Sequence, residues 1–478
     1  MASSFGLFNT AYSGLAAARA ALEVTGENVS NVNTPGYTRQ RVDQVSLAGS
    51  DLGLRTTTGL NIGQGTKISG IARLSDAVVD ARVRDTTASD GYWSAQSSAL
   101  SSVDTSLGEP GTTGISSTLT AFWNAWQAVG TSVGSNGSNT TGAMATLLNS
   151  AQTLTSRISS GYSTAATQWQ DALTTAKNTV TAVNQAGKTV ATLNDQILRI
   201  EVAGGSANEL KDQRDTALTT LANLTGASTR QNANGTIDVL VGGSTFVSGT
   251  SSRTLEVGGA GSIAALDTST VTLQFSDRAG TAVQLDGGSL AGRLSALAPA
   301  GSGGVYASAA KAYNDVATSL RTTVNTVHRT GVTGDGTTNA DFFGTSGAGA
   351  PAALSLTVPT SAAKVALGMP GAGARDGSLA DKVGQLQHAD GGPDTAWSAF
   401  VTGIGARAQA ASTQATVATS AATAASTART SQNGVDLDEE TANLVVFQHA
   451  YQGAARVLTA VDEMLDTLIN RTGLVGRS

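Results

Sequence analysis

The residues best suited to metal binding or acid–base chemistry are few and widely separated in this chain. The histidines are His328, His388 and His449, and there is no cysteine. Structural zinc sites combine His and Cys ligands at short spacings, and none of these histidines belongs to such a pair. Without cysteine, the chain forms neither disulfides nor thiolate sites. We therefore expect no metal, no cofactor and no thiol nucleophile.

Other groupings are equally weak as catalytic candidates. The run Asp212-Gln213-Arg214-Asp215 contains two carboxylates, but on a helix it is more simply an intrahelical charge network. The glycine-rich run at 301–304 lacks the Lys-Ser/Thr that completes a phosphate-binding loop. No Gly-x-Ser-x-Gly elbow with a credible catalytic triad can be identified. The sequence therefore predicts a protein that is not an enzyme.

The elements that would position side chains are long helices, and the clearest lies at 434–473. Its apolar residues repeat every seven positions, with a second row three residues later, as in a coiled-coil seam. Asp436 and Glu439 have the spacing of a capping box at its start. The first row is Leu437, Leu444, Tyr451, Leu458 and Leu465, and the second is Phe447, Ala454, Val461 and Leu468. So narrow a seam needs a partner helix.

Residues 5–32 carry the same repeat and supply that partner. One row is Phe8, Leu15, Leu22 and Val29, and the other is Ala11, Ala18, Thr25 and Val32. The outer face is rich in Ala and nearly uncharged, which is typical of a helix packed on several sides. We predict that the two helices pair and form an assembly interface through Leu15, Leu22, Val29, Leu444, Phe447, Tyr451, Leu458, Val461, Leu465 and Leu468. The alternative is that both termini dock on a globular core.

Composition limits the remaining possibilities. The chain has 478 residues, of which 13% are charged and 4% aromatic, and a net charge of −6. It has no cluster of Lys and Arg, so we expect no nucleic acid partner. It shows neither a secretory signal peptide nor an apolar run of about 20 residues that could span a bilayer, so we expect no membrane contact. By these signs alone the chain would be cytoplasmic.

The middle of the chain changes from helix to strand and back. The first helix is stopped by Asn33, Thr34, Pro35, Gly36 and Tyr37, where Pro-Gly predicts a type II turn. Long helices are expected at 72–107 and 143–202, and Ser206 with Glu209 predicts a capping box for the helix that follows. Residues 229–290 are strand-like.

These elements predict a mainly α fold with an inserted β-rich domain, an elongated rod of long helices with its terminal helices paired as a coiled coil. We divide it into a terminal unit (1–60 with 431–478), a helical rod domain (61–228 with 291–430) and the β-rich insertion (229–290).

Motifs at both ends resemble the rod, hook and hook-associated proteins of the bacterial flagellum. At the N-terminus these are Ser13-Gly14-Leu15 and the run from Asn28 to Arg39 that contains Asn33-Thr34-Pro35-Gly36-Tyr37. At the C-terminus they are Leu437-Asp438-Glu439-Glu440, Phe447-Gln448, Ala450-Tyr451-Gln452 and Asp466-Thr467-Leu468-Ile469-Asn470. The resemblance covers both ends strongly and the helical middle moderately.

This resemblance implies a structural subunit at the junction between hook and filament. The implied partners are copies of the chain in a ring or tube, the hook protein, a second junction protein below the filament, and a cytoplasmic export chaperone on the C-terminal helix. It also implies an extracellular location, on the flagellum, after export without a cleaved signal peptide. The alternatives are a flagellar hook or distal-rod subunit, whose middle should be mostly β, and a secreted adhesin or enzyme with flagellar-type ends.

Overall fold

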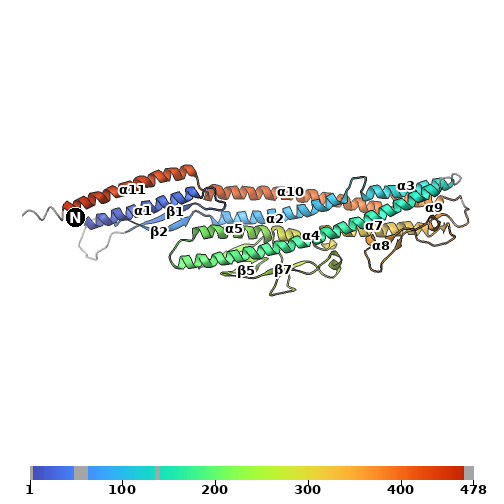
Figure 1. Ribbon diagram of the computed structural model, residues 1–478, viewed down its shortest axis with the longest axis horizontal. Coiled ribbons are helices and arrows are strands. Elements are labelled where there is room, and N and C mark those ends of the chain that lie inside the picture. The colour runs from blue at the N-terminus through green and yellow to red at the C-terminus, as the bar shows by residue number, and fades with distance from the viewer. Residues whose placement is uncertain (1–3, 48–62, 135–139, 374, 468–478) are drawn as a thin grey trace, which may run out of the picture.

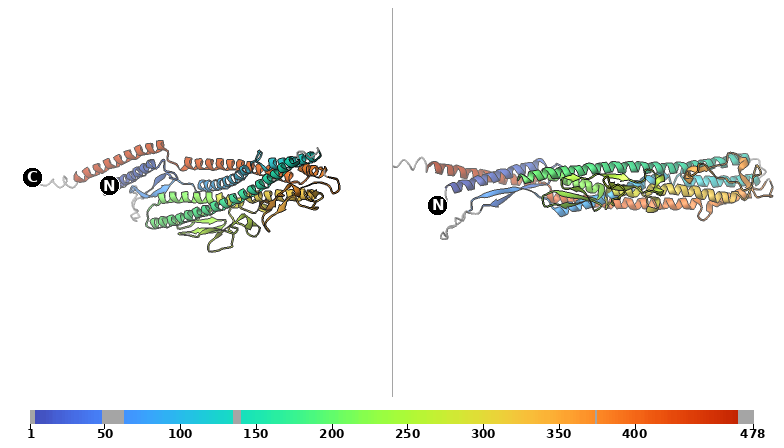
Figure 2. Two further views of the ribbon diagram at one scale, coloured as in Figure 1. Left: turned by 45° about the vertical axis from the view of Figure 1, so that its right-hand side comes forward. Right: turned by 90° about the horizontal axis from the view of Figure 1, so that it is seen from below.

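The protein is an elongated rod of antiparallel helices with a small strand-rich region on one side (Figures 1 and 2). The computed structural model describes residues 4–47, 63–134, 140–373 and 375–467. Helix α1 begins, and helix α11 ends, at the same end of the rod (Figure 1). The mainly α rod with paired terminal helices is thus confirmed.

The terminal pair consists of α1 (Ser4–Ser30) and α11 (Leu437–Asp466), which lie side by side. A hairpin of β1 (Gln40–Ser46) and β2 (Thr66–Arg73) packs against α1. The buried residues of the terminal pair are mostly small, and on α1 they are Ala11, Ala17, Ala18, Ala21, Val24, Thr25 and Asn28. Small side chains let neighbouring elements approach closely. They also leave little apolar surface inside the pair, so its core is thin.

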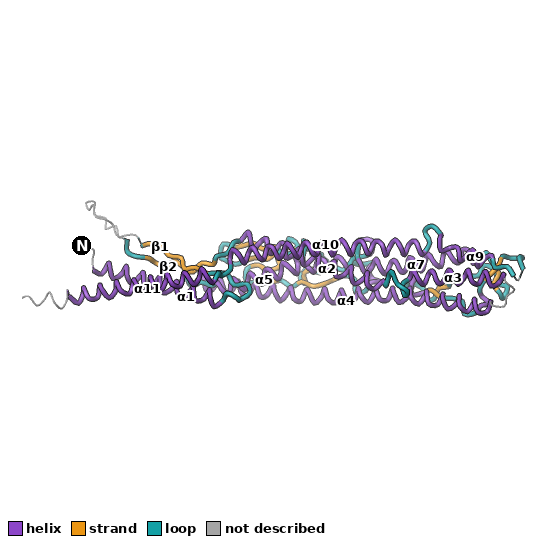
Figure 3. Tube along the Cα trace, turned by 90° about the horizontal axis from the view of Figure 1, so that it is seen from above, coloured by secondary structure: helices purple, strands orange, loops and turns teal. Residues whose placement is uncertain are grey.

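The described part of the rod body is built mainly from helices that run along its length (Figure 3). These are α2 (Ala77–Leu107), α3 (Ile115–Gly134), α4 (Thr140–Val202), α5 (Asn208–Thr225), α6 (Gly288–Ala296), α7 (Val305–His328) and α10 (Pro393–Asn433). Helix α10 lies along α2 and buries one residue in every seven, namely Ile404, Ala411, Ala418 and Ala425. A strip this narrow is a coiled-coil contact made mainly by Ala.

The far end of the rod contains an aromatic core. Phe122 and Trp126 of α3 pack against Phe342, with ring centroids 5.9 and 5.0 Å away. His328 is fully buried beside them and connects a loop to strand β12 (Ala366–Gly368): its Nδ1 lies 2.7 Å from the Ala340 carbonyl and its Nε2 accepts the Ala366 amide at 2.9 Å. Since Nε2 must accept, the ring is the neutral tautomer with its proton on Nδ1.

The strand-rich region lies against α4. A four-stranded antiparallel sheet has the order β3 (Ser228–Gln231), β4 (Ile237–Val241), β5 (Ser244–Ser248) and β6 (Ser251–Ser252). A separate hairpin pairs β7 (Leu255–Gly258) with β8 (Thr272–Phe275). The smaller elements are β9 (Val332–Thr333), β10 (Gly344–Thr345), α8 (Ala352–Ser355), β11 (Leu356–Thr357), β12 (Ala366–Gly368) and α9 (Ser378–Gly384).

Two local expectations are settled by the hydrogen bonds at helix starts. Asp436 caps α11, because its carboxylate accepts the amides of Asp438 and Glu439 at 2.9 and 3.3 Å. The expected capping box of Ser206 is wrong: the N-cap is Ala207, and the Ser206 hydroxyl donates to the Ile71 carbonyl instead. A partner from β2, 135 residues earlier in the chain, outcompetes the local bond.

We predict that buried His328 makes stability fall in mild acid. Burial lowers the pKa of His328 below its usual value, so the folded protein resists a proton that the unfolded chain accepts. Above about pH 6.5 the histidine is neutral in both states and does not affect the free energy of unfolding. Below that pH the free energy of unfolding falls, in total by about 1.4 kcal/mol for each unit by which the pKa is lowered. Thermal melts between pH 7.5 and 5.5 should show this decline.

Replacing the exposed His449 by Gln is the matched control and should leave the decline intact, whereas His328→Gln should flatten it. A pH dependence unchanged in His328→Gln would contradict the assignment.

Candidate functional site

The candidate site is the joint where the terminal pair meets the rod, and the turn at Asn33–Tyr37 lies at its surface. The Tyr37 amide donates to the Thr34 carbonyl at 3.1 Å, and Gly36 has φ +83°, as a type II turn requires. Asn33, Thr34 and Pro35 are exposed, while Gly36 and Tyr37 are half-buried. A Cβ on Gly36 would also lie 2.7 Å from the Thr216 hydroxyl of α5. The turn therefore packs Gly36 closely against α5 of the rod.

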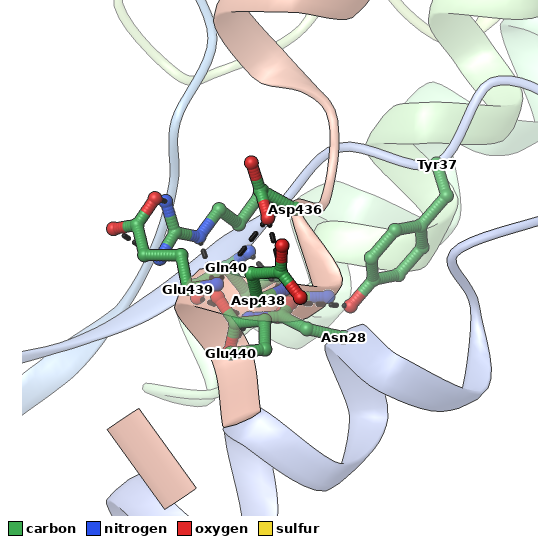
Figure 4. A network of polar contacts seen from close by, with 8 residues as sticks. Asn28, Tyr37, Gln40, Asp436, Asp438, Glu439 and Glu440 are labelled. Atoms are coloured by element: carbon green, nitrogen blue, oxygen red, sulfur yellow. Dashed lines mark hydrogen bonds and ion pairs between the residues drawn. The ribbon is translucent and has the colours of Figure 1, made fainter. Parts of the chain in front are cut away.

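Asn28 is the centre of the joint (Figure 4). Its Oδ1 accepts from the Tyr37 hydroxyl and the Gln40 amide, both at 2.9 Å. Its Nδ2 donates to the Gln40 carbonyl at 2.9 Å and to Glu440 Oε2 at 3.2 Å. The side chain is 1% exposed, so these four bonds use a buried amide in full. One residue thus ties α1 to the turn, to β1 and to the start of α11.

Arg39 clamps the first turn of α11. Its Nη1 and Nη2 donate to the two oxygens of Glu439 at 2.9 and 2.8 Å, and its Nε donates to Glu440 Oε1 at 2.6 Å. The hydrogen bonding of Arg39 to Glu439 is the main cause that raises the pKa of Arg39. Glu440 is 1% exposed and already holds Asn28, so it is the carboxylate most completely enclosed by the joint. Bidentate arginine–carboxylate pairs fix orientation as well as distance.

Burial also affects the tyrosine of the turn. It raises the pKa of Tyr37, with a further increase from the carboxylates of Glu27, Asp212 and Glu209. The phenol therefore keeps its proton and remains a donor to Asn28.

A second cluster attaches the hairpin to α5. Nη2 of Arg73 lies 2.7 Å from Asp212 and 2.6 Å from Asp215, and Asp212 also accepts the Thr38 amide at 3.1 Å. Desolvation is the main reason that the pKa of Asp212 is raised, against the opposing effect of Arg73. The expected intrahelical network is therefore wrong. Asp212 and Asp215 share one face of α5 and meet a cation from β2.

Arg214 lies apart from these carboxylates because neighbouring helical positions point in different directions. Its Nη1 donates to Asn194 Oδ1 at 3.0 Å and to the Gly235 carbonyl at 2.9 Å. It therefore connects α5 to α4 and the strand-rich region, whereas the two aspartates connect α5 to the terminal unit. Burial lowers the pKa of Arg214.

Further contacts complete the joint. Gln40 donates to Glu209 at 2.9 Å and accepts from Asn208 at 2.8 Å, and Arg429 of α10 pairs with Asp80 of α2 at 3.0 Å. These contacts are suited to holding the terminal pair and the rod in one relative orientation, since each acid and base faces a fixed partner. In the described part of the chain, no group of three His, Cys, Asp or Glu side chains is placed to hold a metal ion.

The structure gives the expected assembly residues different degrees of exposure. Val461 is buried (2% exposed), whereas Leu444 and Tyr451 are each 38% exposed. The remaining described ones are half-buried: Leu15, Leu22, Val29, Phe447, Leu458 and Leu465. Leu468 lies outside the described residues.

Other apolar residues of the terminal pair are more exposed than the predicted assembly residues. They are Leu7, Phe8 and Tyr12 on α1, and Leu437, Val445, Val446, Val457 and Met464 on α11, with exposures from 43% to 60%. The sequence carried a signal for them, because Phe8 and Leu437 belong to the heptad rows and α11 is also apolar outside its two rows. Within the described residues, no helix is long and apolar enough to cross a membrane.

Comparisons with known proteins agree along the chain. The family model for the flagellar hook-associated protein FlgK helical domain matches residues 100–343. The C-terminal model of the flagellar basal body rod FlgEFG proteins matches residues 428–471, and the flagella basal body rod protein model matches residues 8–38.

Relatives extend this agreement to the whole length. Flagellar hook-associated protein 1 of Bacillus subtilis is 30% identical over all of both chains. The protein of the same name from Salmonella typhimurium is 27% identical over 70% of this chain and 59% of its own length. A solved flagellar hook junction protein FlgK from Burkholderia pseudomallei has a TM-score of 0.45 at 24% identity, covering 55% of this chain and 46% of that one.

We predict that Glu440→Ala releases the terminal pair from the rod. The change leaves the Asn28 amide and one side of Arg39 without a buried acceptor, and breaking such a buried pair costs about 3–5 kcal/mol. Hydrogen exchange should accelerate in α1 and α11 while α4 and α7 keep their protection.

The matched control is Glu23→Ala, which breaks the exposed pair of Arg19 and Glu23 on α1 and should change stability by less than about 0.5 kcal/mol. Equal exchange in wild type and Glu440→Ala would show that the joint does not hold the pair.

Proposed function

This chain belongs to the flagellar hook-associated protein 1 family, and from that premise we propose that it is a structural subunit of the junction between hook and filament. We propose that copies of it assemble in a ring or tube through the apolar faces of their terminal helices. Its role in the flagellum is then mechanical, with no catalytic step.

The observation that carries this proposal is the exposed apolar surface of the terminal pair. Leu437, Leu444 and Tyr451 on α11 are 48%, 38% and 38% exposed, and Phe8 and Tyr12 on α1 are 43% and 59% exposed. A monomeric protein rarely leaves so many large apolar side chains exposed along one pair of helices. Neighbouring copies would remove this surface from water, at about 25 cal/mol per Å² of apolar area.

The joint supports the same proposal from another direction. An interface on the terminal pair transmits load to the rod through whatever connects the two. Here the connection is a set of short, directional bonds centred on Asn28 and Glu440. Such bonds favour one orientation of the pair more strongly than apolar packing does.

The division of the chain follows from this arrangement. We propose a terminal unit (1–60 with 431–478), a helical rod domain (61–228 with 291–430) and a β-rich insertion (229–290). Because β2 (Thr66–Arg73) pairs with β1, we extend the first segment of the terminal unit to about residue 75, and the rod domain then begins after it.

We propose four partners for these units: further copies of the chain, the hook protein, a second junction protein towards the filament, and an export chaperone. The chaperone would cover α11 before assembly. Without it, the exposed apolar residues of α11, which neighbouring copies bury in the assembly, would be in contact with water. Export would then proceed without a cleaved signal peptide, to the outside of the cell.

The test compares three substitutions by Asp at different positions of α11. Tyr451→Asp should leave the melting of the monomer unchanged within about 0.5 kcal/mol, because the site is partly solvated, yet block incorporation at the hook tip. Val461→Asp should instead destabilise the pair by several kcal/mol, since it buries a charge against α1. His449→Asp, on the polar face of the same helix, should do neither. Melts of the purified chain and labelling of hook tips measure the two effects.

Normal filaments from Tyr451→Asp would contradict assembly through this face. Loss of incorporation in His449→Asp as well would show that the effect of a new charge does not depend on which side of α11 carries it, which would count against a specific row.

A further inference from the structure

A polar cavity opens on the surface of the rod, away from the joint. It has a volume of about 220 Å³ and is lined by residues of α2, α4, α6 and α7. The side chains that matter here are Ser102, Gln168, Asp171, Arg293 and Tyr306. Asp171 and Ser102 are exposed, while Tyr306 is buried, so the cavity has a wet mouth and an enclosed floor. We call it the rod cavity.

Arg293 is the unusual member of this lining. Within the described residues, no hydrogen bond or ion pair engages its side chain, and its Nε is buried without an acceptor. Arg293 is half-buried, and its Nε has lost water without gaining an acceptor, which is costly. Its fork of N–H groups matches the paired oxygens of a carboxylate or phosphate.

Two further groups in the rod cavity lack partners of complementary kind. The Nε2 of Gln168 donates to the carbonyl and hydroxyl oxygens of Ser102 at 3.3 and 3.2 Å, which fixes the amide orientation and leaves its Oε1 buried without a donor. Tyr306 is 7% exposed, and its hydroxyl bonds to no described residue. Burial raises the pKa of this phenol, so it keeps its proton and can donate.

The walls of the rod cavity are held in place on both sides of Arg293. Gln96 of α2 donates to the Gly292 carbonyl at 3.1 Å, and the Trp169 indole of α4 donates to the Leu297 carbonyl at 3.1 Å. Helix α6 is thereby fixed at one residue before Arg293 and four residues after it. A site whose walls are fixed before the ligand arrives loses little entropy on binding.

We propose that the rod cavity binds a small oxyanion that carries a hydroxyl group, of which hydrogen phosphate is the simplest. Its oxygens accept hydrogen bonds from Arg293 and Tyr306, and its hydroxyl donates to Gln168 Oε1. Asp171 at the mouth adds a second acceptor for such a hydroxyl and repels anions that have none. The cavity volume admits one phosphate with a water or two, and no large ligand.

Titration of the full-length monomer with inorganic phosphate, followed by ³¹P NMR at constant ionic strength and pH 6.5, tests this. Wild type should broaden and shift the signal with saturation. Arg293→Gln should weaken binding about ten- to a hundredfold, as expected for losing a charged hydrogen-bond partner. Sulfate, which carries no proton at this pH, should displace phosphate only at a concentration at least about tenfold higher.

Three variants keep the outcome decisive. Arg278→Gln removes an exposed arginine elsewhere and should bind as wild type. Tyr306→Phe keeps the buried ring and should bind several-fold more weakly, and Arg293→Lys should retain part of the affinity, so a fold defect in Arg293→Gln does not decide the result. Absence of saturable binding to wild type, undiminished binding to a folded Arg293→Gln, or equal affinity for sulfate would each overturn the proposal.

Discussion

The buried contact between Asn28 and Glu440 is the interaction on which the rest of this structure depends. It joins residues 412 positions apart, and Arg39 and Tyr37 bond to the same two side chains. Burying a carboxylate is costly unless its oxygens are all engaged, and here Asn28 and Arg39 engage both of them. The terminal helices can therefore leave the rod only by exposing or abandoning several polar groups together. That requirement gives the pair one orientation, although its own apolar core is thin.

This arrangement separates stability from assembly. The large buried side chains lie in the rod, where Trp123, Trp126, Trp169 and Trp397 are all at most 1% exposed. The terminal pair instead buries Ala, Thr and Val, and leaves its largest apolar residues partly uncovered. A rod stabilised by its own core can carry such a pair without depending on it. The uncovered surface is then free to be buried by neighbouring subunits.

Much of the fold was readable from local signals. Heptad rows, the Asp436 cap and the Pro-Gly turn gave the terminal helices, the end of α1 and the start of α11. Helix α2 ends at Leu107, as expected, followed by the Gly108 C-cap with φ +67°. Signals failed where the deciding partner was distant in sequence. Ser206 bonds to Ile71, and Asp212 and Asp215 pair with Arg73, so neither outcome follows from spacing along a single helix.

The candidate site was less predictable than the fold. A heptad pattern identifies apolar rows but does not say which row an intramolecular partner covers, and here Val461 is covered while Tyr451 is not. The signature turn was evident from its residues, yet Asn28 and Glu440 carried no sign of their pairing. The rod cavity was equally hidden, because Gln168 on α4 is far along the chain from Arg293 and Tyr306 on α6 and α7.

The most direct test of this account uses the absence of cysteine in the sequence. A single cysteine introduced as Tyr451→Cys can be labelled with a thiol reagent in the purified monomer and again in isolated hook–filament junctions. Tyr451→Cys should label rapidly in the monomer and be strongly protected in the junction, while Val461→Cys should label slowly in both. Equal labelling of Tyr451→Cys in the two states would contradict assembly through the exposed face of the terminal pair.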